Sequence, residues 1–219
     1  MTSTAPDIVA LDRIAVHESL RVVELAQEAD WERDTPCTGW TLRQLVAHMA
    51  AQHYGFAAAA QGAGSEAAYW RKPEDMSEPG QTYRVAATVV LTAFAEPAVA
   101  EREFVLPELG GAFPGRMALG FHFIDYMVHA WDVAATLGVG LDLPGHVLEA
   151  ALAVARLVPT DPAGRGPGFA FAPVLDAPAG AGPLDEALRL LGRAPEKWPL
   201  TRADRPESNI QSQRGLSGG

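Results

Sequence analysis

Two residues of one predicted helix have the types and the spacing of metal ligands. Asp125 and His129 are four positions apart, so on a helix they share one face and lie about 6 Å apart along its axis. A carboxylate oxygen and an imidazole nitrogen both bind divalent metals at about 2.0 to 2.2 Å. The pair can close on one ion, but two ligands do not make a tight site. A third ligand must come from another helix.

His48 is the best candidate for the third ligand, because it lies near the core side of the apolar-rich second helix. With Asp125 and His129 it would form a set of two histidines and one carboxylate. Such a set leaves positions open for water and substrate, as a catalytic metal requires. The alternative is an ordinary ion pair, or a buried histidine that is satisfied by a hydrogen bond.

Other polar side chains are candidates for roles around this ion. His122 precedes His129 by seven residues on nearly the same face, and could be a ligand, a group behind a ligand or a substrate contact. Asp132 either caps a turn or accepts a hydrogen bond from a ligand histidine. An anionic substrate would need a cation nearby, for which Arg84 and Arg116 are candidates. The alternative is that each is an ordinary solvated arginine at the surface, where arginine is common. The remaining histidines are His17, His53 and His146, of which the first and last are expected at the surface.

The single cysteine, Cys37, directly precedes the second predicted helix. The positive end of the helix dipole there could lower the pKa of its thiol and favour a nucleophile. No partner base is evident, so a structural role is favoured. A lone cysteine also excludes an intrachain disulfide, which fits a reducing, cytoplasmic compartment.

The elements that must position these residues are predicted to be helical. Apolar residues recur at helical spacing, Thr41 and Gln44 form a capping box, and Gly or Pro clusters separate the periodic segments. Helices are expected at 7–28, 41–60, 81–96, 114–137, 144–158 and 183–191, with an extended crossover at 103–106 and an irregular connection at 160–183. The pattern predicts an all-α bundle of four long helices with a long crossover and short additional C-terminal helices. Residues 1–200 would form one domain, and the polar segment 201–219 a disordered tail.

The charge of the chain argues against several classes of partner. Its 219 residues include 17 basic and 27 acidic side chains, for a net charge of −10. Nucleic acid phosphates and anionic membranes would repel such a chain, and no apolar run approaches the roughly 18 residues of a membrane span. The expected protein is a cytoplasmic monomer or homodimer that acts on a small molecule, with neither nucleic acid nor membrane as partner.

Several strings of the sequence resemble the motifs of a known family. The segment TPCTGWTLRQLVAH, which ends at His48, is similar to the first motif of the mycothiol-dependent maleylpyruvate isomerase-like proteins. These proteins belong to the DinB/YfiT-like superfamily of metal-binding helical bundles. The segment DYMVHAWDVA, from Asp125, resembles the second motif, in which a carboxylate precedes a histidine by four positions. The string LLGRAP at 190–195, followed by Trp198, resembles the end of one branch of the family.

The resemblance implies a DinB-like four-helix bundle that holds a divalent metal, commonly zinc, on His48, Asp125 and His129. Nickel, iron or cobalt would suit the same donors. One departure concerns the carboxylate, because the isomerases proper carry Glu where this chain has Asp125. Aspartate is one methylene shorter, so the metal must sit closer to that helix or the helix must approach.

The implied activity is that of a metal-dependent enzyme with mycothiol as thiol cosubstrate, acting as isomerase or S-transferase on a small electrophile. A bound metal would lower the pKa of a thiol or of water and hold the resulting anion. Two alternatives remain open: a thiol-independent hydrolase or natural-product tailoring enzyme, and a metal-binding protein without turnover. A fourth protein ligand from His122 or His53 would favour the last.

Overall fold

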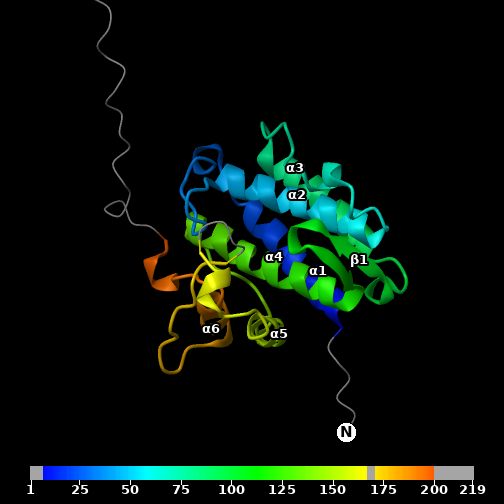
Figure 1. Cartoon of the computed structure of the whole chain (residues 1–219). Helices are drawn as coiled ribbons and strands as arrows, with labels where there is room; N and C mark the ends of the chain where they lie inside the picture. Colours follow the sequence, from blue (N-terminus) through cyan, green and yellow to red (C-terminus); the bar gives the residue numbers. More distant parts are fainter. Residues whose placement is uncertain (1–6, 167–170, 200–219) are drawn as a thin grey trace, which may run out of the picture.

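The computed structural model describes residues 7–166 and 171–199 (Figure 1). Its α-helices in this part of the chain are α1 (Ile8–Val23), α2 (Leu42–Ala60), α3 (Pro79–Phe94), α4 (Gly115–Leu137), α5 (Gly145–Ala155) and α6 (Pro183–Leu190). The strands β1 (Glu103–Leu106) and β2 (Gly111–Pro114) pair antiparallel, with Glu103 opposite Pro114 and Leu106 opposite Gly111. Short 3-10 helices cover Glu28–Asp30, Ala67–Trp70, Val99–Glu101, Pro107–Leu109, Pro162–Gly164 and Pro195–Lys197.

The four long helices pack as two pairs. Helix α1 lies against α4, and α2 lies beside α3; α5 and α6 pack on each other next to α4 (Figure 1). The predicted all-α bundle with additional C-terminal helices is therefore confirmed. The crossover between α3 and α4 is the β1–β2 hairpin, of which only the first strand was expected; it contacts α2 and α4. The expected tail at 201–219 lies outside the described residues.

Helix α4 is the central helix of the bundle. Most of its residues are buried, including the polar His122, His129 and Asp132. A helix that is buried nearly all round needs partners on every side, and α4 contacts α1, α2, α5 and the hairpin. It ends at Leu137, and the Gly138 that follows has a left-handed φ of 72°, a conformation that favours glycine. The buried side chains of α4 are thus held in place by packing against these elements.

The loop before α2 is folded tightly against the helix that follows. Thr41 caps α2 by accepting from the Gln44 amide at 3.4 Å, and the Gln44 side chain accepts from the Thr41 amide at 3.1 Å, so the predicted capping box is confirmed. The Trp40 amide donates to the Cys37 carbonyl at 3.0 Å, and Gly39 has a φ of 84°, as a glycine at the third position of a tight turn does. This turn fixes Cys37 and Trp40 near the start of α2.

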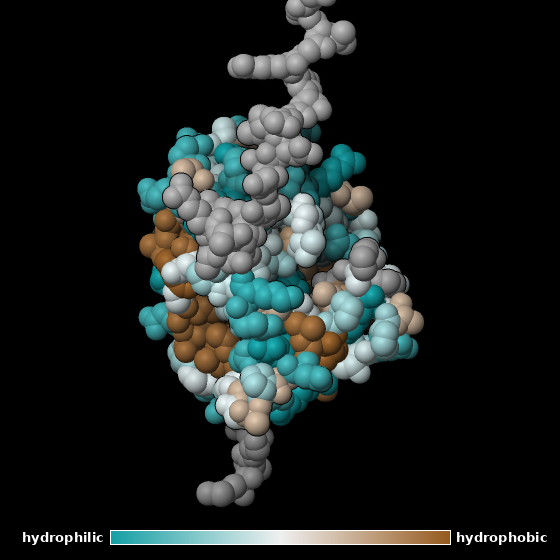
Figure 2. Space-filling model, turned by 90° about the vertical axis from the view of Figure 1, so that its left-hand side faces the viewer, coloured by the Kyte–Doolittle hydropathy of each residue, from teal (hydrophilic) through white to brown (hydrophobic). Residues whose placement is uncertain are grey.

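The surface is mixed in character. In Figure 2 hydrophobic side chains form separate patches between polar ones on the face in view. Among the described residues no helix is long and apolar enough to cross a membrane.

Candidate metal centre

Helices α2 and α4 bring His48, Asp125 and His129 together. One ligand atom from each residue lies within 4.8 Å of those of the other two. The His129 Nε2 is 3.3 Å from Asp125 Oδ1, and the His48 and His129 rings meet edge to face, with centroids 5.5 Å apart. The Asp125–His129 pair forms at helical spacing, and His48 completes the group from the neighbouring helix. The three predicted ligands therefore occupy one place in the fold.

The surroundings of these groups set their protonation in the absence of a metal. Burial, together with the His129 charge, lowers the pKa of His48 to about 4, so its imidazole is neutral at pH 7. Burial opposes ionisation of Asp125, but the neighbouring His129 outweighs it and the pKa falls to about 2. Burial likewise opposes protonation of His129, but the Asp125 charge and hydrogen bond prevail and raise its pKa well above the usual value.

The donor set fits a divalent cation. His48 has no hydrogen bond from either ring nitrogen to any residue in the described ranges, so a lone pair is free for coordination. The Asp125 side chain is 32% exposed, whereas that of His129 is only 7% exposed. Solvent therefore reaches the candidate ligands from the Asp125 side, whereas protein covers His129. A neutral imidazole, a carboxylate and an imidazole that can lose one proton are donors that suit a divalent metal with open coordination positions.

We expect metal uptake at pH 7 to release about one proton per ion from the ligand groups. His48 is already neutral and Asp125 already ionised, so the proton comes from His129. Because His129 has a raised pKa in the metal-free state, metal affinity should increase as the pH rises toward that pKa. Titration calorimetry in buffers of different ionisation enthalpy measures the number of protons released per metal ion. Any proton released by a metal-bound water is subtracted from this number. Uptake without proton release would contradict this assignment.

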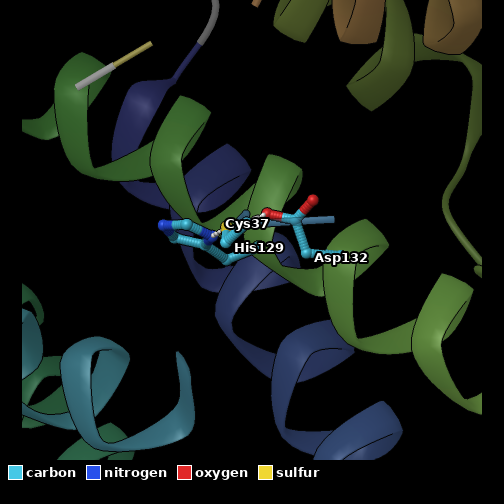
Figure 3. Close-up of side chains that lie close together, drawn as sticks. All are labelled: Cys37, His129 and Asp132. Atoms are coloured by element: carbon cyan, nitrogen blue, oxygen red, sulfur yellow. Dashed lines mark hydrogen bonds and ion pairs between the residues drawn. The ribbon is translucent and has the colours of Figure 1, made fainter. Parts of the chain in front are cut away.

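A second group of side chains lies behind His129, on the side away from Asp125. Cys37, His129 and Asp132 lie close together there (Figure 3). The His129 Nδ1 donates to Asp132 Oδ2 at 2.9 Å, and the Cys37 thiol donates to the same oxygen at 3.1 Å. The Arg193 guanidinium donates to both Asp132 oxygens, at 3.2 and 2.8 Å. The sequence indicated, as one alternative, that Asp132 accepts a hydrogen bond from a candidate ligand histidine, and the structure contains the bond from His129.

This second group is an ion-pair network and does not suit a metal. The guanidinium of Arg193 occupies the space that a cation would need, 3.3 Å from the Cys37 Sγ. Burial and the Asp132 charge raise the pKa of the Cys37 thiol, which keeps it protonated. Burial opposes ionisation of Asp132, but Arg193 and His129 hold its pKa well below the usual value. Cys37 therefore acts as a hydrogen-bonding thiol within the network, in agreement with the favoured structural role.

His122 does not belong to the group of candidate ligands and takes part in a separate buried chain of hydrogen bonds. Its Nδ1 is 2.6 Å from Asp12 Oδ1 and its Nε2 is 3.2 Å from His53 Nδ1. The chain continues from His53 Nε2 to the Tyr83 hydroxyl at 3.2 Å and to Ser19 at 2.6 Å. His122 and His129 are seven residues apart, which is about 10 Å along the axis of α4. Although they share a face of the helix, they therefore contact different residues. The His122 side chain has no exposed surface for a substrate.

The two predicted arginines do not join the centre either. Arg84 lies on the outer face of α3, 54% exposed, in an ion pair with Glu24 at 2.9 Å. Arg116 is exposed near the start of α4. Lys72, by contrast, carries a charge that reaches the candidate ligands, since it helps to lower the His48 pKa. Its Nζ stands 4.4 Å from the Trp40 ring centroid, and Trp40 packs on His48 with centroids 4.9 Å apart.

No role was predicted for Lys72 or Arg193 from the sequence. Lys72 is one of two lysines in the chain, the other being Lys197, and this scarcity was the one available signal. Arg193 stood in the LLGRAP string, but its partner Asp132 is 61 positions away. The two peripheral histidines, His17 and His146, are exposed as expected. A surface hollow of about 420 Å³ lined by Arg13, His17 and Arg21 contains none of the metal-ligand candidates.

Comparisons with known proteins identify the family of this chain. The family model described as the mycothiol maleylpyruvate isomerase N-terminal domain matches residues 13–134, a range that includes Cys37, His48, Asp125, His129 and Asp132. The chain belongs to this family. Uncharacterized proteins from two strains of Mycobacterium tuberculosis are each 32% identical over 159 residues, which is 73% of this chain and 82% of theirs.

Solved structures of this family's namesake share the fold. The crystal structures of the mycothiol-dependent maleylpyruvate isomerase and of a histidine-to-alanine mutant of it each align with a TM-score of 0.52, at 17% and 16% identity. Each match covers 68% of this chain and 66% of the other. At this identity the match establishes a shared helical fold. Arg193 lies outside the residues 13–134 that the family model matches. The match to the family therefore does not extend to the ion pair between Arg193 and Asp132.

Proposed function

We propose that the protein is a metal-dependent enzyme that uses mycothiol as cosubstrate, acting as isomerase or S-transferase on a small electrophile. The observation that carries the proposal is the convergence of His48, Asp125 and His129, whose ligand atoms lie within 4.8 Å of one another. Membership of the mycothiol maleylpyruvate isomerase family supports the thiol. The donors, two imidazoles and one carboxylate, suit zinc, nickel, iron or cobalt; we infer zinc because it is the metal that the family resemblance implies.

Each residue of the candidate site has a distinct role in this proposal. A divalent metal, when bound, would lower the pKa of a thiol or water and stabilise the resulting anion. His48 offers a neutral imidazole without prior loss of a proton, and Asp125 offers a carboxylate at the exposed side. Asp132 holds the far nitrogen of His129 by a 2.9 Å hydrogen bond. Trp40 packs on His48 and shields that side of its ring from water.

The proposal is tested by assaying the purified protein on maleylpyruvate and on a panel of electrophiles, with and without mycothiol. We expect turnover that requires both the thiol and the bound metal. Turnover that is independent of thiol would favour the hydrolase alternative. Near-stoichiometric metal without turnover or thiol adduct would favour a binding protein.

Lys72 is the cation we expect to contact an anionic substrate, in place of Arg84 and Arg116. Replacement of Lys72 by Met should raise KM for a carboxylate substrate about threefold to tenfold, because an exposed charge pair contributes about 1 kcal/mol. Metal content should not change. The matched control is Lys197→Met, which removes the other lysine. Steady-state kinetics that give both variants the wild-type KM would show that Lys72 does not contact the substrate.

A further inference from the structure

Three segments that are distant in the sequence meet behind His129. Cys37 comes from the loop before α2, Asp132 from α4, and Arg193 from the residues after α6. Asp132 is completely buried and Arg193 is 8% exposed. A buried ion pair of this kind is costly to form unless its geometry is good. Here all four heteroatoms of the carboxylate and the facing guanidinium edge are paired, at 2.8 and 3.2 Å.

The chain places Arg193 by a specific helix ending. After α6 the Gly192 amide donates to the Arg189 carbonyl at 3.0 Å and the Arg193 amide donates to the Leu188 carbonyl at 2.8 Å. This is the Schellman pattern, which requires a left-handed residue, and Gly192 has a φ of 79°. A Cβ at Gly192 would lie 2.6 Å from the Ala172 Cβ, too close for any side chain. The turn directs Arg193 back toward α4.

The network determines which nitrogen of His129 is free for a metal. Asp132 Oδ2 accepts from the Nδ1 of His129, so the proton of the neutral ring stays on that nitrogen and the lone pair stays on Nε2. The Nε2 is the nitrogen that faces Asp125. Arg193 clamps both oxygens of Asp132 and also donates to the Cys37 sulfur at 3.3 Å. The carboxylate therefore cannot rotate away from His129 without breaking a buried ion pair.

We propose that Arg193 is a positioning residue of the metal centre. Through Asp132 it fixes the tautomer and the ring orientation of His129, so the segment after α6 supports metal binding although none of its described residues is a ligand candidate. The inference rests on the metal-dependent function proposed above. Partners behind a ligand histidine typically contribute 10-fold to 100-fold to metal affinity.

The test uses the full-length protein, freed of metal and titrated with Co²⁺. Affinity is measured by chelator competition, and ligand geometry by the visible absorption of the bound cobalt. We expect Arg193→Met to weaken cobalt binding about 10-fold to 100-fold and to change the absorption spectrum. Arg193→Lys should recover part of the affinity, because it keeps the charge but loses the two-pronged geometry. Asp132→Asn should resemble Arg193→Met.

The matched control is Arg189→Met, in the same segment. Arg189 pairs with Asp185 and Glu196, so this variant loosens α6 and leaves the contacts of Asp132 in place. It should bind cobalt within about twofold of wild type. Wild-type affinity and spectrum in Arg193→Met, or an equal loss in Arg189→Met, would overturn the positioning role. Absence of cobalt binding by the wild-type protein would overturn the proposed function itself. If Arg193→Met does not fold, the cobalt affinity and absorption spectrum of Arg193→Lys are compared with those of the wild type and of Arg189→Met instead. A wild-type affinity and spectrum in Arg193→Lys would then overturn the positioning role.

Discussion

Replacement of His129 by Ala should abolish metal binding, with the metal content falling from near-stoichiometric to near zero. His129 is the one residue that belongs to both groups at this place in the fold: its Nε2 faces Asp125 and its Nδ1 is held by Asp132. Its loss leaves two ligands from two different helices, which do not hold a divalent ion tightly. His48→Ala should have the same effect on metal content. Elemental analysis of the purified variants measures it, and thiol-dependent turnover should fall in parallel.

The matched control for these variants is His146→Ala. His146 is exposed on α5, so its replacement removes an imidazole of no structural importance and should leave the metal content at the wild-type level. Full occupancy in both His48→Ala and His129→Ala would remove the proposed site. Loss of metal in His146→Ala as well would point instead to nonspecific binding at the surface.

Replacement of Asp12 by Ala should lower the free energy of unfolding by about 3 kcal/mol while the folded fraction keeps its metal. Asp12 is 1% exposed and lies 2.6 Å from His122, which is itself completely buried. Without Asp12 the His122 imidazole keeps only His53 as a hydrogen-bond partner among the described residues. Burial, together with His122, lowers the pKa of His53, so this partner is a neutral imidazole and cannot replace the carboxylate. Denaturant unfolding followed by circular dichroism measures the change.

The control for Asp12→Ala is Glu149→Ala, which removes an exposed carboxylate from α5 and should change the free energy of unfolding by less than about 0.5 kcal/mol.

The Asp12→Ala variant also decides between two roles for His122. A structural role gives Asp12→Ala reduced stability with normal KM for the substrate in the folded fraction. A changed KM at unchanged stability would favour the substrate contact that the position of His122 on α4 first indicated.

Local sequence signals identified the elements of the fold and part of the centre. The helical periodicity and the Thr41–Gln44 capping box placed α2, and the spacing of Asp125 and His129 placed both on one face of α4. These signals act within one or two helical turns, where the backbone geometry fixes which side chains are neighbours. His48 was proposed as the third ligand from its place near the core side of the second helix, and the resemblance to the isomerase family supported that choice; no local spacing links it to the pair.

Contacts between distant segments were decided by the tertiary structure. His122 shares a helix face with His129, yet packs against Asp12 of α1 because it lies farther along the axis of α4. Lys72, and neither predicted arginine, lies near the ligands because the loop after α2 returns over Trp40.

The sequence by itself determined the helices, the Asp125–His129 pair and the family motifs, because each is written in residues close together along the chain. Only the tertiary structure decided which groups stand behind that pair. Arg193 reaches Asp132 because α6 ends in a glycine turn and packs with α5 beside α4. The physical reason is that a hydrogen bond depends on distances of a few tenths of an ångström, and helix packing sets these distances between segments far apart in the chain.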